Sequence, residues 1–431
     1  MTGPLAMPSV DVIVLGAGMA GLTAAVRLAE AGLRVTTVAK GYGSLRLAPA
    51  TIDVLGYDPG LVDNPGQALP GFAIAHPEHP YAQIGATALP TVLADSVQWL
   101  KDHVGTYAYV GDPGANMLLP TALGVPRPSA LVPETMAAGD LRSAGSLLIA
   151  GFGVLKDFHP SLVAENLEAA TAARGRPVKA RPVMLNPPTG GEADVGALAL
   201  ARRFEDAAFR HAVAAELRMA VTGDETIGVP AVLGLDQARS VWTELQEATG
   251  RSVFEIPTPV PPSVPGMRLA KALQDRLRQA GGRFVLGAEA AGPELRNSEL
   301  AGVRIRAAAR ATPRTCRWVV LATGGLSAGG IVVDVSGAAS EPALGLPVHA
   351  PGPGQEGFLP GYLDEHPMET AGLRVDNRLR PIGPDGEPVY PNVYAAGAVI
   401  GGARPWREKS GEGIALTTGY LAAEEILKEA G

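Results

Sequence analysis

The chain of 431 residues has only one cysteine, Cys316. A single thiol forms no disulfide within the chain, and it cannot supply the several thiolates of an iron–sulfur cluster or a structural zinc site. The cysteine content therefore gives no reason to place the protein in an oxidising, extracellular compartment. If the protein passes electrons beyond a bound cofactor, the next carrier has to lie on another chain.

Long apolar runs and a surplus of basic residues are missing as well. No stretch approaches the roughly 18 uncharged apolar residues of a membrane-spanning helix. The run at residues 12–15 lacks the basic start and the cleavage site of a signal peptide. The net charge of −7 argues against a general binder of nucleic-acid phosphates, which carries a basic surface. We therefore expect a cytoplasmic protein that binds no nucleic acid.

Apolar residues and turn-forming residues are abundant instead. Hydrophobic residues make up 46% of the chain and charged residues 18%, which excludes a disordered chain. The 54 glycines and 38 prolines are spread among strongly apolar segments, so they indicate many turns and places where the backbone comes close to something else. A chain of this length predicts two or three domains.

The first forty residues follow a strand–turn–helix–strand pattern. Residues 10–15 form a β-branched run typical of a buried parallel strand, residues 22–31 are predicted to be helical, and residues 33–39 form a second strand. The turn between the first strand and the helix reads Gly16-Ala-Gly18-Met-Ala-Gly21. A G-x-G-x-x-G turn in this setting predicts dinucleotide binding.

Each glycine of this turn has a separate physical role. Gly16 allows the tight turn, Gly18 lets a pyrophosphate approach the backbone, and Gly21 lets the helix pack on the sheet, while the helix N-terminus faces the negative charge. The acidic residue expected at the end of the second strand is absent, and Lys40 stands near that place. Lys40 either contacts a phosphate or is a solvated lysine at a strand end.

Two later segments repeat the pattern of a strand that runs into glycines. An apolar strand at residues 317–322 leads into Thr323-Gly-Gly325, and a strand at residues 392–396 leads into Gly397-Ala398. Near the end, Gly411-Glu-Gly413 precedes a helix predicted at residues 414–427. The N-terminal dipole of this helix could face the pyrimidine edge of a flavin, or the helix could be purely structural.

The middle of the chain, residues 142–256, is predicted to be a small α/β unit with a parallel sheet. It contains no second phosphate loop, so we expect it to serve as a cap or a partner surface. The strands are expected at residues 146–150, 182–185 and 230–234, and the helices at residues 161–173, 195–217 and 237–249. A proline-rich linker at residues 257–262 separates this unit from an amphipathic helix at residues 267–279.

The three glycine-rich segments, in this order, resemble two-domain flavoproteins of the succinate dehydrogenase/fumarate reductase type. The resemblance implies that the first segment binds the flavin diphosphate, the second lies along the cofactor, and the third reaches the ribitol and the ring. It also implies an α/β fold in which a discontinuous Rossmann-like, glutathione-reductase-like FAD-binding domain carries an inserted α/β cap. We expect the flavin domain at residues 1–45, 262–345 and 375–431, the inserted region at 46–261, and a connecting cap segment at 346–374.

Shorter stretches along nearly the whole chain are similar to the B subunits of anaerobic glycerol-3-phosphate dehydrogenases. They include Ile52-Asp-Val-Leu55, His79-Pro-Tyr81, Pro261-Pro-Ser-Val-Pro-Gly-Met-Arg268 and Glu341-Pro-Ala-Leu-Gly-Leu346. The resemblance implies a flavin-carrying chain that works beside a catalytic partner (the A component) and an iron–sulfur partner (the C component). Together they oxidise sn-glycerol 3-phosphate to dihydroxyacetone phosphate and pass electrons toward quinone. It further implies membrane contact only through a partner, on the inner face of the cell membrane.

Two flavins are possible cofactors at this stage. The dinucleotide turn favours FAD, whereas the resemblance to the B subunits implies FMN; no metal is expected. Lys40 in place of an acid, and Ala398 where many relatives have an aspartate, depart from the usual FAD contacts. The predicted cofactor-binding residues are Gly16, Gly18, Met19, Ala20, Gly21, Lys40, Thr323, Gly324, Gly325, Gly397, Ala398, Gly411 and Gly413.

The catalytic base stays unknown, and three residues are candidates for catalysis: His79, Arg404 and Arg268. A histidine side chain can act as a base near neutral pH, and the arginines could hold an anionic group, although structural roles are open for all three. Arg378 and Arg380 are further candidates for anion binding, with salt bridges as the alternative. Fumarate reduction, an electron relay without its own substrate site, and a scaffold with a structural or lost flavin remain alternative functions.

Overall fold

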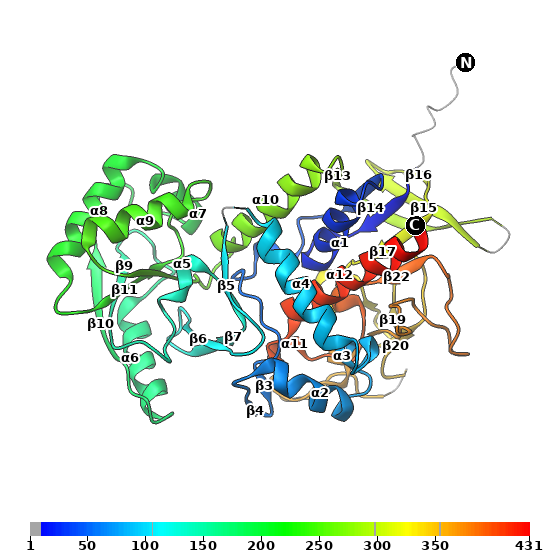
Figure 1. The fold of residues 1–431 in the computed structure, drawn as a ribbon, viewed down its shortest axis with the longest axis horizontal. Coiled ribbons are helices and arrows are strands. Elements are labelled where there is room, and N and C mark those ends of the chain that lie inside the picture. Colours follow the sequence, from blue (N-terminus) through cyan, green and yellow to red (C-terminus); the bar gives the residue numbers. More distant parts are fainter. Residues whose placement is uncertain (1–9, 106, 297–298, 353–354) are drawn as a thin grey trace, which may run out of the picture. The chain divides into compact units, whose positions relative to one another are not determined.

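The computed structural model describes residues 10–105, 107–296, 299–352 and 355–431 (Figure 1). The chain divides into two compact units. The first unit comprises Met1–Ser44, Gly66–His103 and Leu273–Gly431, and the second comprises Leu45–Pro65 and Val104–Ala272. The first unit is therefore built from both ends of the chain.

A five-stranded parallel sheet forms the centre of the first unit, in the order β13-β2-β1-β17-β22. Its inner strands are short and apolar, and β1 and β17 are buried along their whole length. The strands are β1 (Val12–Leu15), β2 (Val35–Ala39), β13 (Arg283–Leu286), β17 (Trp318–Leu321) and β22 (Val393–Ala395). Two N-terminal strands thus share one sheet with three strands from the second half of the chain, which confirms the predicted discontinuous Rossmann-like fold.

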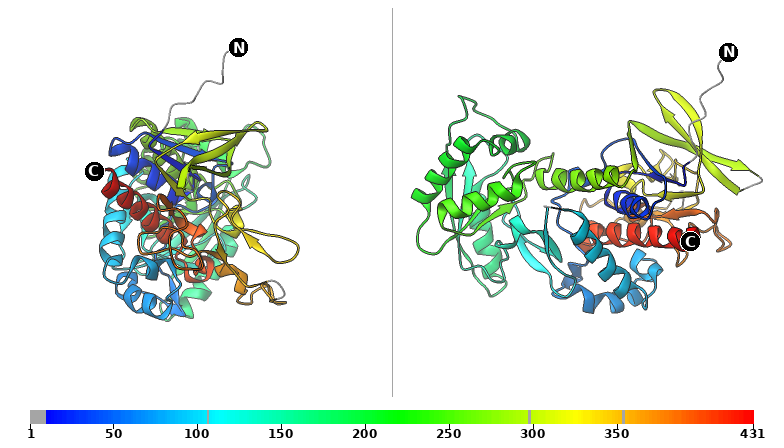
Figure 2. Two further views of the ribbon diagram at one scale, coloured as in Figure 1. Left: turned by 90° about the vertical axis from the view of Figure 1, so that its right-hand side faces the viewer. Right: turned by 45° about the horizontal axis from the view of Figure 1, so that its top comes forward.

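Two long helices cross closely in this unit, α1 (Met19–Glu30) and α12 (Gly411–Ala430). Figure 2 shows them side by side. Gly419 makes the close approach possible, because a Cβ atom there would lie 2.4 Å from the carbonyl oxygen of Ala20. The first turn of α1 and the helix α12 therefore pack backbone against backbone.

Smaller elements complete the first unit. An antiparallel sheet contains β14 (Ala288–Arg296), β15 (Glu299–Ala307) and β16 (Arg310–Thr315). Two-stranded ribbons pair β18 (Val332–Val333) with β19 (Ala339–Ser340), and β20 (Val348–His349) with β21 (Gly372–Leu373). The remaining helices include α2 (Pro65–Ala75), α3 (Pro80–Ile84), α4 (Leu89–His103), α11 (Pro405–Glu408) and the 3₁₀ turn η4 (Gly397–Val399).

The second unit contains the predicted parallel sheet, in the order β10-β9-β11-β12. Its strands are β9 (Ser146–Phe152), β10 (Lys179–Leu185), β11 (Thr226–Pro230) and β12 (Val253–Ile256), and its larger helices are α6 (Pro160–Ala172), α7 (Ala197–Arg203), α8 (Ala207–Ala220) and α9 (Ala238–Thr249). Further elements are α5 (Glu134–Ala137) and the ribbons of β3 (Tyr57–Asp58) with β4 (Gly60–Leu61), β5 (Tyr109–Gly111) with β8 (Leu131–Pro133), and β6 (Met117–Pro120) with β7 (Pro126–Ser129). The helix α10 (Val264–Gln279) begins in this unit and ends in the first.

Two expectations for the second unit were wrong in detail. The helix predicted at residues 195–217 is two helices, α7 and α8, because the carboxylate of Asp206 accepts a hydrogen bond from the backbone of Ala208 and begins a new helix. The strand expected at residues 230–234 instead ends at Pro230. Gly234 has a positive φ of 80°, so it lies in a turn rather than in a strand.

The boundaries of the compact units also differ from the expected domain boundaries. Residues 66–103 belong to the first unit rather than to the inserted region, because α4 packs against the flavin-domain helices. The ring of Trp99 lies 6.4 Å from that of Tyr420, and His103 lies 3.1 Å from Glu30. Residues 346–374 also lie in the first unit, while residues 262–272 lie in the second.

Within the described residues, no helix combines the length and apolar character needed to cross a membrane.

Candidate flavin site

The carboxyl ends of β1 and β17 meet at one edge of the parallel sheet, as do those of β17 and β22. Gly16 turns there with a positive φ of 116°, and a Cβ atom on it would lie 2.1 Å from the carbonyl oxygen of Ala322. A Cβ atom on Gly325 would lie 2.7 Å from the carbonyl oxygen of Ala398. The three glycine-rich segments are therefore in direct contact, and only glycine fits at these approaches.

The third segment also contacts the first helix. Gly397 has a positive φ of 74°, and a Cβ atom on it would lie 3.0 Å from that of Ala20. The backbone N–H of Gly397 donates to Oγ1 of Thr418 at 2.8 Å, which ties η4 to α12. Segments nearly four hundred residues apart in sequence thus surround one edge of the sheet.

The N-terminus of α1 has the properties of a diphosphate site. Gly18 is the N-cap residue, no side chain caps the helix, and the first turn contains no acidic residue. A Cβ atom on Gly18 would meet no atom within 4 Å, whereas one on Gly21 would lie 2.2 Å from the carbonyl oxygen of Gly16. The first N–H groups of a helix have no partners within the helix, so Met19 and Ala20 present donors to an anion. These residues fit a dinucleotide.

Sequence reasoning missed one residue at this turn, Gly43. It has a positive φ of 73°, and a Cβ atom on it would lie 2.9 Å from the backbone nitrogen of Gly18. Gly43 therefore lets the loop after β2 close over the phosphate turn. The signal in the sequence was the Gly41-Tyr-Gly43 segment, which lies just beyond the expected acidic position.

Two predicted cofactor contacts have different surroundings. The Lys40 side chain is 84% exposed and lies 3.4 Å from the carboxylate of Glu289, so an ion pair already engages it. Thr323, in contrast, has a buried Oγ1 with no hydrogen-bond partner among the described residues. A buried hydroxyl normally has a partner, so the unpaired Thr323 hydroxyl fits a polar group of a ligand.

Gly411 and Gly413 lie in the first turn of α12 itself, one turn earlier than the predicted start of this helix. The N-cap residue Ser410 is fully buried, and its hydroxyl donates to Glu408 at 2.8 Å rather than capping the helix. Glu412 places one carboxylate in the first turn. The backbone N–H groups at this helix end thus have no side-chain cap, as at α1.

His79 is buried and both of its ring nitrogens have partners. Nδ1 accepts a hydrogen bond from the backbone N–H of Tyr81 at 3.1 Å, which makes His79 the N-cap of α3. Nε2 lies 3.3 Å from Oε2 of Glu408. Since Nδ1 is an acceptor, the proton is assigned to Nε2, which donates to the carboxylate. His79 has no free lone pair, and this geometry does not support a general base.

Glu408 is a half-buried anion. Burial acts to raise the pKa of Glu408, but hydrogen bonds from His79, from the backbone of Arg404 and from Ser410 outweigh that effect and lower the pKa. The backbone N–H of Arg404 donates at 2.8 Å. Glu408 therefore stays ionised and joins three segments of the first unit.

Arg404 is a cation with little hydrogen bonding. Within the described residues its guanidinium makes no hydrogen bond, and it has only long ion pairs, at 3.8 Å to Glu369 and 4.0 Å to Glu365. The side chain is about one-third exposed. Arg407, by contrast, donates to the backbone oxygens of Leu363 and Asp364. Arg404 is thus the candidate arginine with donors available for an anion.

Arg268 lies in the second unit and is fully engaged. Its guanidinium donates to both oxygens of Glu255, at 2.6 and 2.9 Å, and to the carbonyl oxygen of Gly234. Burial acts to lower the pKa of Arg268, but the charge and hydrogen bonds of Glu255 raise it overall. The structure therefore supports a buried salt bridge for Arg268 and not a catalytic role.

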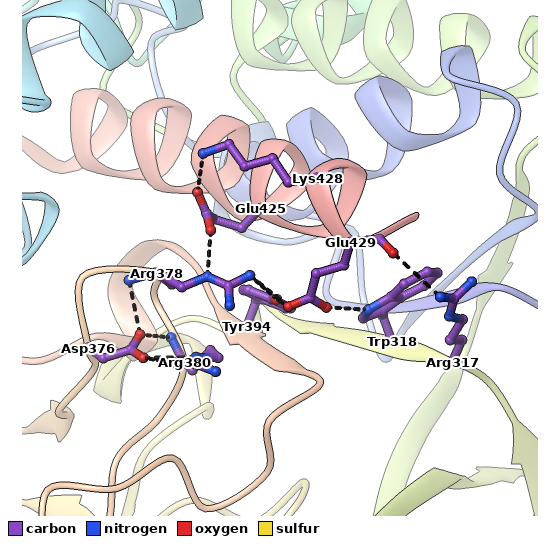
Figure 3. A network of polar contacts seen from close by, with 9 residues as sticks. All are labelled: Arg317, Trp318, Asp376, Arg378, Arg380, Tyr394, Glu425, Lys428 and Glu429. Carbon is purple, nitrogen blue, oxygen red and sulfur yellow. Dashed lines mark hydrogen bonds and ion pairs between the residues drawn. The ribbon is translucent and has the colours of Figure 1, made fainter. Parts of the chain in front are cut away.

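Arg378 and Arg380 also have structural partners (Figure 3). Arg378 donates to Glu425 and Glu429 of α12 at 2.6 Å each, and Arg380 pairs with Asp376 at 2.7 Å. Hydrogen bonds to the two glutamates, with Glu425 the stronger, raise the pKa of Arg378 against the opposing effect of burial. Arg378 therefore links α12 to Tyr394 of β22, whereas Arg380 is held by Asp376 four residues before it. Both arginines thus match the salt-bridge alternative.

Across residues 10–105, 107–296, 299–352 and 355–431, no group of three or more His, Cys, Asp or Glu side chains is placed to hold a metal ion.

Comparison with known proteins shows the family. The family model described as "FAD binding domain" matches residues 11–414. The probable B subunit of the anaerobic glycerol-3-phosphate dehydrogenase of Halobacterium salinarum is 33% identical over 96% of both chains. The corresponding B subunit of Pectobacterium carotovorum is 34% identical over 97% of this chain and 99% of its own.

Two dehydrogenase- or reductase-type proteins are among the solved structures that match this chain. The open conformation of a flavocytochrome c3 fumarate reductase is 11% identical, with a TM-score of 0.45, and covers 99% of this chain and 79% of its own. The 3-ketosteroid delta1-dehydrogenase of Sterolibacterium denitrificans is 11% identical, with a TM-score of 0.46, over 98% of this chain and 100% of its own.

The family model decides between the two flavins, because it describes FAD, and the uncapped end of α1 fits the diphosphate that FAD carries. This confirms FAD, which the dinucleotide turn favours, over the alternative of FMN. The chain belongs to the FAD binding domain family and, within it, to the anaerobic glycerol-3-phosphate dehydrogenase B subunits, and it is a flavin oxidoreductase.

Proposed function

We propose that this chain is the FAD-carrying member of a complex that oxidises sn-glycerol 3-phosphate to dihydroxyacetone phosphate and passes the electrons to quinone. The observation that carries the proposal is the similarity to B subunits over 96–97% of the chain. The contact of all three glycine-rich segments at one sheet edge supports it. FAD supplies the redox chemistry when bound, since it accepts the two electrons released as the alcohol becomes a ketone.

The residues of the first unit have distinct proposed roles. The N–H groups of Met19 and Ala20 and the open face of Gly18 hold the diphosphate, and the Thr323 hydroxyl donates to the cofactor or accepts from it. The predicted roles of Gly324, Gly325, Gly397, Ala398, Gly411 and Gly413 are to let backbone approach the rest of the cofactor. The predicted phosphate contact of Lys40 requires that it leave Glu289.

Arg404 is the proposed contact for the substrate phosphate. Its guanidinium has no hydrogen-bond partner within the described residues, and it lies in the segment that leads from η4 to α12. Planar guanidinium groups suit phosphate because they donate two parallel hydrogen bonds. Replacing Arg404 by alanine should raise the KM for glycerol 3-phosphate about tenfold to a hundredfold, the loss of a charged hydrogen bond. Arg251→Ala, at a solvent-exposed ion pair of the second unit, is the matched control.

The partners and the location follow from the same relatives. Their names describe one subunit of an enzyme, so we propose that this chain too works within a multi-subunit complex. The proposed partners are a catalytic chain (the A component) and an iron–sulfur chain (the C component), with membrane contact on the inner face through a partner only. One cysteine cannot ligate a cluster, which agrees with electrons leaving through another chain.

Anaerobic reduction of the bound flavin tests the function. The purified, FAD-loaded chain is mixed with sn-glycerol 3-phosphate, and the visible absorbance is followed with and without the partner chains. Bleaching by the chain alone shows a substrate site on this chain. Failure to bleach even in the assembled complex would contradict the proposed function.

An electron relay is the second candidate, and the geometry of His79 favours it. Both ring nitrogens of His79 are engaged, so the candidate base has no free lone pair with which to accept a proton. A relay predicts that glycerol 3-phosphate bleaches the flavin only when the catalytic partner is present. The same assay therefore separates the two candidates.

A further inference from the structure

The His79-Pro-Tyr81 segment has no role in the proposed function, yet it contacts the C-terminal glycine segment closely. Gly402 has a positive φ of 96°, and a Cβ atom on it would lie 2.0 Å from the carbonyl oxygen of Glu78. The backbone of Gly402 therefore lies directly on the residue before His79. Both segments belong to the first unit.

A chain of hydrogen bonds extends from His79 to the start of α12. Nε2 of His79 lies 3.3 Å from Oε2 of Glu408, and the same oxygen accepts from the Ser410 hydroxyl at 2.8 Å. Oε1 of Glu408 accepts from the backbone N–H of Arg404 at 2.8 Å. One carboxylate thus binds the histidine, the N-cap of α12 and the arginine segment.

The contact between His79 and Glu408 has little access to water. The His79 side chain is 1% exposed and that of Glu408 is 16% exposed, so water cannot easily replace a lost partner. A buried carboxylate that loses a donor keeps its desolvation cost without compensation. The loop at residues 402–410 would then shift until Glu408 reached another donor or solvent.

We propose that His79 and Glu408 are a positioning pair that holds the loop at residues 402–410, and thereby sets the N-terminus of α12 against the FAD and places Arg404 for the substrate phosphate. This inference rests on the proposed placement of FAD at that helix end. His79 acts through Glu408 and does not touch the cofactor. Its position in sequence, 329 residues before Glu408, gives no hint of this role.

The two ring nitrogens of His79 allow a sharp test. Asparagine places an oxygen where Nδ1 lies, so His79→Asn keeps the cap of α3 but cannot reach Glu408. Glutamine places an amide donor near the position of Nε2, so His79→Gln keeps the contact with Glu408 but loses the cap. His211→Asn, at an exposed histidine of α8, is the matched control. A purely capping histidine and a positioning histidine therefore predict opposite results.

FAD affinity, measured by fluorescence titration of the apoprotein, is the main readout, and urea unfolding of the apoprotein is the second. His79→Asn should weaken FAD binding about tenfold, the loss of one hydrogen bond to a charged group, and should also lower apoprotein stability, because Glu408 loses a donor. His79→Gln should bind FAD within about twofold of the wild type while the apoprotein unfolds at lower urea. His211→Asn should change neither quantity.

Glu408→Gln and the double variant complete the test. Both carboxylate oxygens of Glu408 accept hydrogen bonds, so in Glu408→Gln the amide NH₂ group replaces one acceptor and faces a donor. Glu408→Gln should therefore weaken FAD binding to the same extent as His79→Asn. If the pair acts as one unit, the double variant should be no weaker than either single variant. Additive losses, or normal FAD binding by His79→Asn with impaired binding by His79→Gln, would overturn the inference. FAD binding needs no substrate, so these results stand even if glycerol 3-phosphate fails to reduce the flavin.

Discussion

Gly16 and Gly18 belong to the same turn, but only Gly18 has room for a side chain. Gly16 has a positive φ and no room for a Cβ atom, whereas Gly18 has an ordinary φ of −76° and faces open space. The fold therefore requires the first glycine, whereas we propose that the ligand requires the second. A substitution at each position separates these requirements.

Gly16→Ala should destabilise the apoprotein by about 1–3 kcal/mol, because alanine is strained at this φ and overlaps Ala322. Gly18→Ala should leave apoprotein stability within about 0.5 kcal/mol of wild type but weaken FAD binding more than about tenfold, since its methyl group projects where the diphosphate approaches. Urea unfolding and FAD titration measure the two effects. Equal loss of stability in both variants would contradict this division of roles.

Cys316 offers a second prediction at the residue scale. Burial raises the pKa of the Cys316 thiol to about 12, with a small opposing effect from the backbone of Ile13. The thiolate is the reactive form, so the native protein should be alkylated only very slowly at pH 8. Mass spectrometry should find one added group after unfolding and almost none before. Rapid alkylation of the folded protein would contradict the raised pKa of the half-buried Cys316 thiol.

At the scale of elements, the end of α12 is fastened to the sheet by a polar network (Figure 3). Glu429 accepts hydrogen bonds from Trp318 of β17 at 2.8 Å, from Tyr394 of β22 at 2.8 Å and from Arg378 at 2.6 Å. The helix whose N-terminus is proposed to face the flavin is thus held at its far end by both strands that lead into the second and third glycine segments.

The network predicts a pH dependence of stability. Burial acts to raise the pKa of Glu429, but the hydrogen bonds from Trp318, Tyr394 and Arg378 outweigh it and hold the pKa below its usual range. A depressed folded-state pKa means that the stabilisation is present above the unfolded-state pKa and is lost as the pH falls through the folded-state value. Stability should therefore decline in acid below about pH 4.5.

Glu429→Gln tests this prediction. The variant should be less stable than wild type by about 2 kcal/mol at pH 7, the loss of charged hydrogen bonds, and the difference should shrink as the pH falls. Urea unfolding at a series of pH values measures it. A difference that stayed constant down to pH 3 would show that the charge of Glu429 is not the cause.

At the scale of the whole molecule, the discontinuous first unit makes FAD binding a stabilising event for both chain ends. A ligand that binds only the folded state adds about 2.7 kcal/mol when its concentration is a hundred times Kd. We expect FAD to slow amide exchange in β1, β17 and α1 together, although these elements come from both ends of the chain. Protection confined to residues of the second unit would contradict the proposed placement of FAD.

The sequence alone predicted the features that depend on local backbone requirements. Strand runs, a glycine that must adopt a positive φ, and an uncapped helix start are local properties. The three glycine segments, the parallel sheets and the G-x-G-x-x-G turn at the start of α1 therefore followed from the pattern of residues. The sequence analysis missed the boundary between α7 and α8, because the surrounding residues predict one continuous helix. In the structure, Asp206 caps the N-terminus of α8 and so begins a second helix.

Only the tertiary structure decided which side chains are engaged and which have donors to spare. His79, Arg268 and Arg378 have side chains that suit a catalytic or anion-binding site. In the structure, however, they are paired with Glu408, Glu255 and Glu425, respectively. The sequence does not distinguish Arg404 from the other arginines, whereas the structure shows that its guanidinium has only long ion pairs. The partner of a long polar side chain depends on which segments pack together, and packing joins residues hundreds of positions apart. The backbone pattern therefore determined the family and the type of cofactor, because strands and glycine turns are local features, whereas tertiary contacts decided which charged residues are already paired.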